Sequence, residues 1–187
     1  MKRAATSWIA LLRGVNVGGN KKVPMAELRE MLATLGLDEP RTILQSGNAF
    51  FHARGGDRRQ ITAALEAATR KRFGFDVTYL LRTSAEWRAI VAANPFPAAA
   101  AADPGHLLLF ALSAAPSAAA IAALEANVPG DEKVRVIGSE LYAHYPSGIG
   151  TSKLDNARID RHLRVISTGR NWNTVLKLAH LGQEIAP

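Results

Sequence analysis

Hydrophobic positions in the first half of the chain follow the period of a strand, a helix, two strands, a helix and a strand. Strands are expected over residues 7–13, 41–45, 48–53 and 76–82. The first helix begins near Pro24 and keeps its apolar residues on one face, and Gly36 follows its end. The second begins after Asp57, a capping residue, and ends at Gly74. This order of elements is the ferredoxin-like pattern.

The second half begins in the same way and then departs from the pattern. A capping box over Thr83–Glu86 predicts a linking helix, and the Pro/Gly/Ala-rich stretch Asn94–Gly105 predicts a linker. A strand (106–112), a helix (about 117–127) and a hairpin (133–137 with 140–145) follow, and after them the pattern predicts helices instead of a final strand. The expected fold class is therefore α+β, with tandem ferredoxin-like units of which the second is incomplete and ends in helices. The expected division is a first unit over residues 1–82, and a linking helix, second unit and C-terminal helices over residues 83–187.

Composition narrows the class of protein. The 187 residues are 48% hydrophobic and 21% charged, which is typical of a folded globular chain. The absence of cysteine excludes disulfides and thiolate metal sites and fits a reducing cytosol. We expect neither a signal peptide nor a membrane-spanning segment, so the predicted location is the cytoplasm and no membrane partner is expected.

Charge suggests an anionic partner. The formal net charge is +7 and the pI is about 10.1. A basic surface attracts phosphates and nucleic acid. A solvated basic surface without a nucleic-acid partner explains the same numbers equally well.

Four segments at element boundaries combine glycine with amide, hydroxyl and cationic side chains. Such turns can offer backbone N–H groups, fixed cations and a helix N-terminus to an anion. The candidate ligand-binding residues in them are Arg13, Asn16, Gly18, Gly19, Lys21, Gln45, Ser46, Asn48, Gly148, Gly150, Ser152, Lys153, Arg170, Asn171 and Asn173.

The first segment does not fit a known nucleotide motif, and the other three also have a purely structural explanation. The first, Arg13–Lys22, has the glycine separation of a P-loop but lacks the hydroxyl that would hold Mg²⁺, which excludes a Walker-type NTPase. The pattern of the second, Gln45–Asn48, favours a hairpin turn over a binding site, whereas the third, Tyr145–Lys153, is equally a connecting loop. In the fourth, Thr168 is a plausible helix cap and Trp172 a core residue.

Other chemistries have little support in the sequence. The five histidines have no metal-ligand spacing, and no serine stands in a G-x-S-x-G elbow. We therefore expect no metal and no cofactor, and no residue is assigned a catalytic role.

The segments LLRGVNVGGNKKVPMAELR, LQSGN, YPSGIGTSKL and TGRNWNTVLKL occur in this order. Together they resemble the signature segments of a bacterial family known as domain of unknown function 1697, over essentially the whole chain. The resemblance implies a tandem of two ferredoxin-like units. It implies no activity and no catalytic residues, because the family is uncharacterised.

The leading hypothesis is an anion-binding cleft built from the four segments, with a nucleotide, a phosphometabolite or a nucleic-acid backbone as ligand. An alternative is a structural or partner-binding protein in which the polar segments knit the two half-domains together. A third is a phosphate-directed transferase or hydrolase that stabilises charge without a dedicated nucleophile. The sequence leaves the oligomeric state open.

Overall fold

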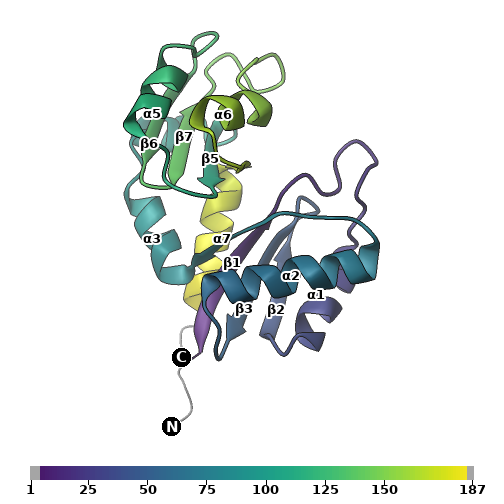
Figure 1. The fold of residues 1–187 in the computed structure, drawn as a ribbon. Coiled ribbons are helices and arrows are strands. Elements are labelled where there is room, and N and C mark those ends of the chain that lie inside the picture. Colours follow the sequence, from purple (N-terminus) through teal and green to yellow (C-terminus); the bar gives the residue numbers. More distant parts are fainter. Residues whose placement is uncertain (1–4, 185–187) are drawn as a thin grey trace. The chain divides into compact units, whose positions relative to one another are not determined.

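The computed structural model describes residues 5–184. These residues form a mixed α+β fold with two four-stranded antiparallel sheets and seven helices (Figure 1). By compactness the chain divides into two units, one containing the chain up to Ala89 together with the part from Lys177 onward, and the other formed by Ile90–Leu176. Both crossings fall inside helices, α3 (Ser84–Ala92) and α7 (Trp172–Glu184). The boundary expected at residue 82 stays a prediction.

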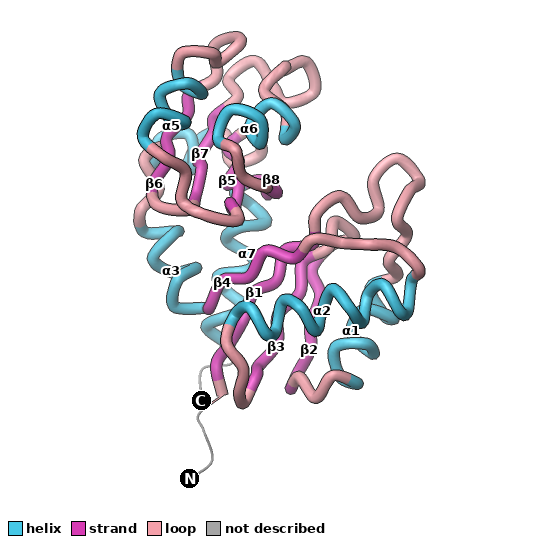
Figure 2. Tube along the Cα trace, in the orientation of Figure 1, coloured by secondary structure: helices cyan, strands magenta, loops and turns pink. Residues whose placement is uncertain are grey.

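The first unit contains a sheet with strand order β2-β3-β1-β4. Its strands are β1 (Thr6–Leu12), β2 (Asp38–Ile43), β3 (Asn48–Ala53) and β4 (Tyr79–Thr83). Helices α1 (Met25–Thr34) and α2 (Arg58–Phe73) lie over one face of this sheet (Figure 2). That face and the helices share a core that includes Trp8, Leu28 and Leu65.

Local capping signals define α2. The Asp57 side chain accepts a hydrogen bond from the Gln60 N–H, and the Gln60 side chain accepts one from the Asp57 N–H, which completes a capping box. Gly74 ends the helix in the left-handed conformation. The expected limits of this helix are therefore confirmed.

The second unit contains a sheet with strand order β6-β7-β5-β8. Its strands are β5 (Leu107–Leu112), β6 (Lys133–Ile137), β7 (Glu140–His144) and β8 (Ser167–Asn171). Helices α5 (Ala118–Glu125) and α6 (Asn156–Leu163) pack on a core that includes Phe110, Leu124 and Ile159. The side chains of Ser117 and Asp155 cap these two helices.

Two expectations for the second half are wrong. The chain forms a fourth strand, β8, where helices were expected, because β5 has a free edge with which Ser167–Asn171 pairs in antiparallel register. This strand, STGRN, contains no hydrophobic residue, so the hydrophobic pattern alone misses it. The stretch expected to be a linker contains a short helix, α4 (Pro97–Ala102), with Pro97 at its first position.

Candidate functional site

Asn16 ties the first two candidate segments together. Its Nδ2 donates to the carbonyl oxygens of Val23 (2.9 Å) and Gln45 (2.7 Å), and its Oδ1 accepts from the Val23 N–H (2.8 Å). Asn16 has a φ of +57°, a conformation that asparagine tolerates better than most residues. This amide therefore holds the loop after β1 against the β2–β3 turn.

Residues 16–21, here called the finger, form a miniature hairpin. A β-bridge joins Val17 to Asn20, and the two glycines between them have φ values of +60° and +78°, as a type I′ turn requires. The loop projects beyond the end of β1 (Figures 1 and 2). Gly18, Gly19 and Lys21 are exposed, and Val17 exposes 67% of its surface.

Lys21 also anchors the base of the finger. Its Nζ donates to the Asp76 carbonyl (2.8 Å), and the Asp76 carboxylate is held in two hydrogen bonds by Arg70. Arg13, just before the finger, is partly exposed, and its N–H donates to the Thr78 carbonyl. Lys21 and the ion pair of Arg70 with Asp76 thus lie at the base of the finger.

The second segment is a tight structural turn. Gly47 has a φ of +75°, and a Cβ there would lie 2.5 Å from Val15 Cγ2 and 2.7 Å from Leu12 Cβ. Asn48 is fully buried and donates from Nδ2 to the Ile43 carbonyl and the Ser46 hydroxyl. Gln45 and Ser46 are exposed. The turn explanation therefore accounts for Gly47 and Asn48.

The third segment is tied to acidic side chains. The Ser152 hydroxyl donates to the Glu132 carboxylate and accepts from the Leu154 N–H, and the Ser147 hydroxyl donates to Asp131 (2.7 Å). Gly150 and Lys153 are exposed, whereas Gly148 is partly buried. These carboxylates oppose the binding of an anion by this loop, so Lys153 is the group in it that best suits an anion.

The fourth segment differs from its expected form. Thr168 and Arg170 belong to β8, and the helix cap is Asn171, whose Oδ1 accepts from the N–H and the hydroxyl of Thr174. Trp172 is buried, as expected, and Asn173 is exposed.

Arg170 is a buried cation. Its side chain donates to the Thr168 hydroxyl (2.9 Å) and the Gly169 carbonyl (2.7 Å), and burial lowers its pKa to about 10. Its exposed fraction is 7%, so a ligand from solvent would reach it only where the surrounding residues leave an opening.

Arg82 is the counterpart of Arg170 in the first unit, although it lies outside the four candidate segments. Arg82 in β4 pairs with Ile9 in β1, as Arg170 in β8 pairs with Leu109 in β5. Both arginines are buried, and each precedes a residue that caps the next helix, Thr83 or Asn171. The recurrence of an arginine, a capping residue and a helix was visible in the sequence and marks corresponding places in the two units.

Asp103 links two histidines at the end of the second sheet. Its Oδ1 lies 2.9 Å from His106 Nδ1 and its Oδ2 lies 3.2 Å from His144 Nε2. The Tyr145 N–H donates to the His106 carbonyl, so this cluster adjoins the third segment. Within residues 5–184, however, no group of three or more potential ligands is arranged to hold a metal ion.

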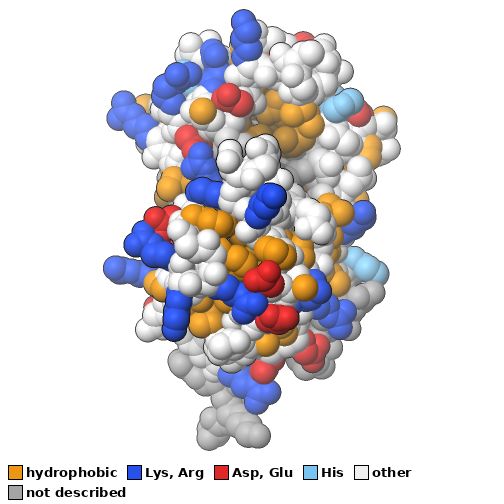
Figure 3. Space-filling view, turned by 90° about the vertical axis from the view of Figure 1, so that its right-hand side faces the viewer, with side chains coloured by type: hydrophobic (Ala, Val, Ile, Leu, Met, Phe, Trp, Pro, Cys, Tyr) orange, Lys and Arg blue, Asp and Glu red, His pale blue; other side chains and the backbone are white. Residues whose placement is uncertain are grey.

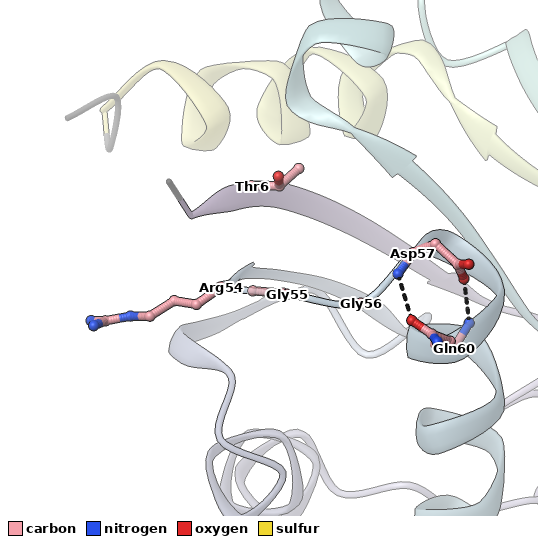
Figure 4. A pocket seen from close by; sticks show the side chains of 7 residues that line it. Thr6, Arg54, Gly55, Gly56, Asp57 and Gln60 are labelled. Atoms are coloured by element: carbon pink, nitrogen blue, oxygen red, sulfur yellow. Dashed lines mark hydrogen bonds between the residues drawn. The ribbon is translucent and has the colours of Figure 1, made fainter. Parts of the chain in front are cut away.

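No candidate residue lines any of three hollows on the described part of the surface. The first, of about 420 Å³, is lined by residues around the start of α2. In Figure 4 the Asp57 and Gln60 side chains there bond to each other's backbone, and Arg54 points away from them. Arg54 forms an ion pair with Asp38. The other two hollows lie between α5 and α6 (about 260 Å³) and between α1 and α2 (about 350 Å³).

The structure groups the candidate segments by unit. The first two are bonded to each other in the first unit. The third segment begins where β7 ends, and the fourth runs through the end of β8 into α7; both strands pair antiparallel with β5, so their ends lie at the same end of the second sheet. A single cleft of all four segments stays a prediction.

The fold and these loops define a two-unit α+β protein with polar, glycine-rich turns at the ends of both sheets. Residues 5–142 match the family described as "Protein of unknown function (DUF1697)", and the chain belongs to that family. It is also similar to the conserved bacterial protein SP0830 from Streptococcus pneumoniae, at 23% identity over 96% of this chain and 99% of that one, with a TM-score of 0.75. A search of curated proteins returns no significant match. Within the described residues, no helix combines the length and the apolar character that crossing a membrane requires.

Proposed function

We propose that this protein binds a phosphate-bearing anion at the base of the finger, and that the ligand is the backbone of a nucleic acid. The main support is the distribution of charge. Residues 1–89 and 177–187 contain sixteen Lys and Arg against nine Asp and Glu, whereas residues 90–176 contain seven of each. The whole excess of +7 thus belongs to the first unit.

The finger suits a phosphate for local reasons. Its two exposed glycines leave their backbone open to close approach, and Arg13, Lys21 and Lys22 supply positive charge beside them. The bonds of Asn16 and Lys21 fix the base of the finger, so little ordering is needed on binding.

An extended ligand fits better than an enclosed metabolite. None of the three hollows is lined by a finger residue. On the face drawn in Figure 3, Lys and Arg side chains occur in groups separated by acidic and apolar ones. Such a surface favours contacts with successive phosphates over capture of one small molecule, and it argues against a transferase or hydrolase.

The test measures binding of a fluorescein-labelled 20-nucleotide duplex and single strand by anisotropy at two salt concentrations. Three phosphate contacts predict an affinity that falls roughly 40-fold between about 50 and about 200 mM salt. Lys22→Ala should make the slope of log binding constant against log salt concentration shallower by about one. The control Lys177→Ala, which removes an exposed lysine from α7, should leave this slope unchanged. No binding at low salt, or equal effects of the two substitutions, would reject the proposal.

A structural role is the second candidate, and the asparagine hydrogen bonds favour it. Asn16, Asn48 and Asn171 each satisfy backbone groups in their own unit, as residues that specify packing would do. If oligonucleotides and phosphates fail to bind while asparagine substitutions lower stability, this candidate replaces the first.

We also propose that the two units are ferredoxin-like copies of one βαββαβ element. The identical strand orders and the matching positions of Arg82 and Arg170 support this duplication. The lack of cysteine supports a cytoplasmic location.

A further inference from the structure

The hollow between α5 and α6 differs from the rest of the second unit in charge. It has a volume of about 260 Å³ and is lined by Ser117, Ala119, Ala120, Ala123, Arg161, His162 and Arg164. None of these residues is acidic, although the unit as a whole is neutral. Three basic side chains therefore gather in the hollow without a counter-charge in its wall.

The two arginines are available to a ligand. Among the described residues, neither Arg161 nor Arg164 forms an ion pair or a side-chain hydrogen bond. The neighbouring Arg158 instead donates to the Asn127 carbonyl, and Asp160 accepts from the Ser167 hydroxyl. The charged groups next to them on α6 are thus engaged elsewhere.

The opposite wall is apolar and shallow. Ala119, Ala120 and Ala123 present only methyl groups, because α5 keeps its larger residue Leu124 in the core. A ligand here would meet guanidinium groups on one side and a flat apolar surface on the other. The volume lies below the roughly 300–1,000 Å³ of pockets for drug-sized molecules, which limits the apolar part to about one ring.

We propose that this hollow binds a small phosphate monoester with a single apolar ring or a short acyl group. Arg161 and Arg164 hold the phosphate dianion, since two guanidinium groups with planar donors match its charge and its oxygens. The apolar group lies on the alanines of α5. This site is independent of the proposed nucleic-acid surface, because all its residues belong to the second unit.

Arg164 permits a substitution that separates binding from folding. It ends α6 with a φ of +55°, in the left-handed region where glycine is normally preferred. Arg164→Gly removes the cation and relieves the backbone, so the variant should fold at least as stably as the parent protein. A structural role for the arginine at the end of the helix predicts the opposite change in stability.

The experiment titrates the full chain with phenyl phosphate, inorganic phosphate and phenol, using calorimetry and amide chemical shifts. We expect phenyl phosphate to bind with a dissociation constant on the order of 1 mM or tighter. Inorganic phosphate should bind about tenfold more weakly because it lacks the ring, and phenol should not bind. The largest shifts should occur at the amides of Ala119, Ala120 and Arg164.

Variants locate the site. Arg164→Gly and Arg161→Gln should each weaken phenyl phosphate by about tenfold or more. Arg135→Gln removes an exposed arginine of β6 outside the hollow and should change nothing, and Lys22→Ala should not either. The proposal is overturned if phenyl phosphate does not saturate the protein, if both arginine variants bind it unchanged, or if the shifts map elsewhere.

Discussion

Replacing Asn16 tests how much of the finger's structure depends on one amide. Asn16→Ala removes three hydrogen bonds, two to Val23 and one to Gln45. Val23 is fully buried, so its N–H and carbonyl would lose their partner away from water. The Gln45 carbonyl, in an exposed residue, can be hydrated instead.

The magnitude follows from these contacts. An unsatisfied buried group costs roughly 1–3 kcal/mol, and alanine at a φ of +57° adds about 1 kcal/mol. We expect Asn16→Ala to lower the free energy of unfolding by about 3–5 kcal/mol. Asn16→Gly, which tolerates the backbone conformation, should cost about 1 kcal/mol less.

The assay is urea unfolding followed by tryptophan fluorescence, together with hydrogen exchange of the Val23 amide. Trp8 and Trp87 are buried in the first unit and report on it. The control is Asn20→Ala, because the Asn20 side chain at the fingertip makes no hydrogen bond within the described structure and is exposed. An Asn16→Ala variant as stable as this control, with Val23 still protected from exchange, would refute the reasoning.

Three further predictions rest on other local features. Gly47→Ala should lower the free energy of unfolding by about 2–4 kcal/mol, because the added methyl group would overlap Val15 and Leu12. The control Gly36→Ala, also at positive φ but with open space around it, should lower it by only about 1 kcal/mol. Equal losses for the two variants in urea titrations would contradict the overlap. Asp57→Ala should cost about 0.5–2 kcal/mol by removing the cap of α2, whereas Asp57→Asn should retain most of the stability, as thermal unfolding can measure. Burial raises the pKa of Tyr79 to about 12 and raises the pKa values of Tyr142 and Tyr145 as well, so the native protein should show little tyrosinate absorbance at pH 10. The free energy of unfolding should fall as the pH rises from about 10 to about 12, because only the tyrosines of the unfolded chain ionise in that range. Half-ionised tyrosines in the native protein at pH 10 would disprove this.

Elements with local signals could be predicted from the sequence. The limits of α2 follow from Asp57 and Gly74, and the start of α3 follows from the reciprocal bonds of Thr83 and Glu86. The hairpin of β6 and β7 turns at Gly138, as expected, with a φ of +60°. These features depend on residues within a few positions of one another, so the sequence carries the necessary information.

The candidate site was harder to predict because glycine and asparagine serve turns and ligands equally well. Sequence alone could not distinguish an Asn16 that binds an anion from one that bonds to Gln45, 29 positions away. The basic hollow between α5 and α6 was also missed, because it combines alanines of one helix with arginines at the end of another.

The sequence by itself determined the caps of α2 and α3, the order of the first six elements and the excess of positive charge in the first half. Tertiary structure decided the fourth strand of the second sheet, because Ser167–Asn171 becomes a strand only against the free edge of β5. It also decided the partners of Asn16 and the burial of Arg82 and Arg170, since each depends on contacts between distant segments. The physical reason is that a cap or turn is stabilised within one stretch of chain, whereas strand pairing and burial need a surface that another stretch supplies.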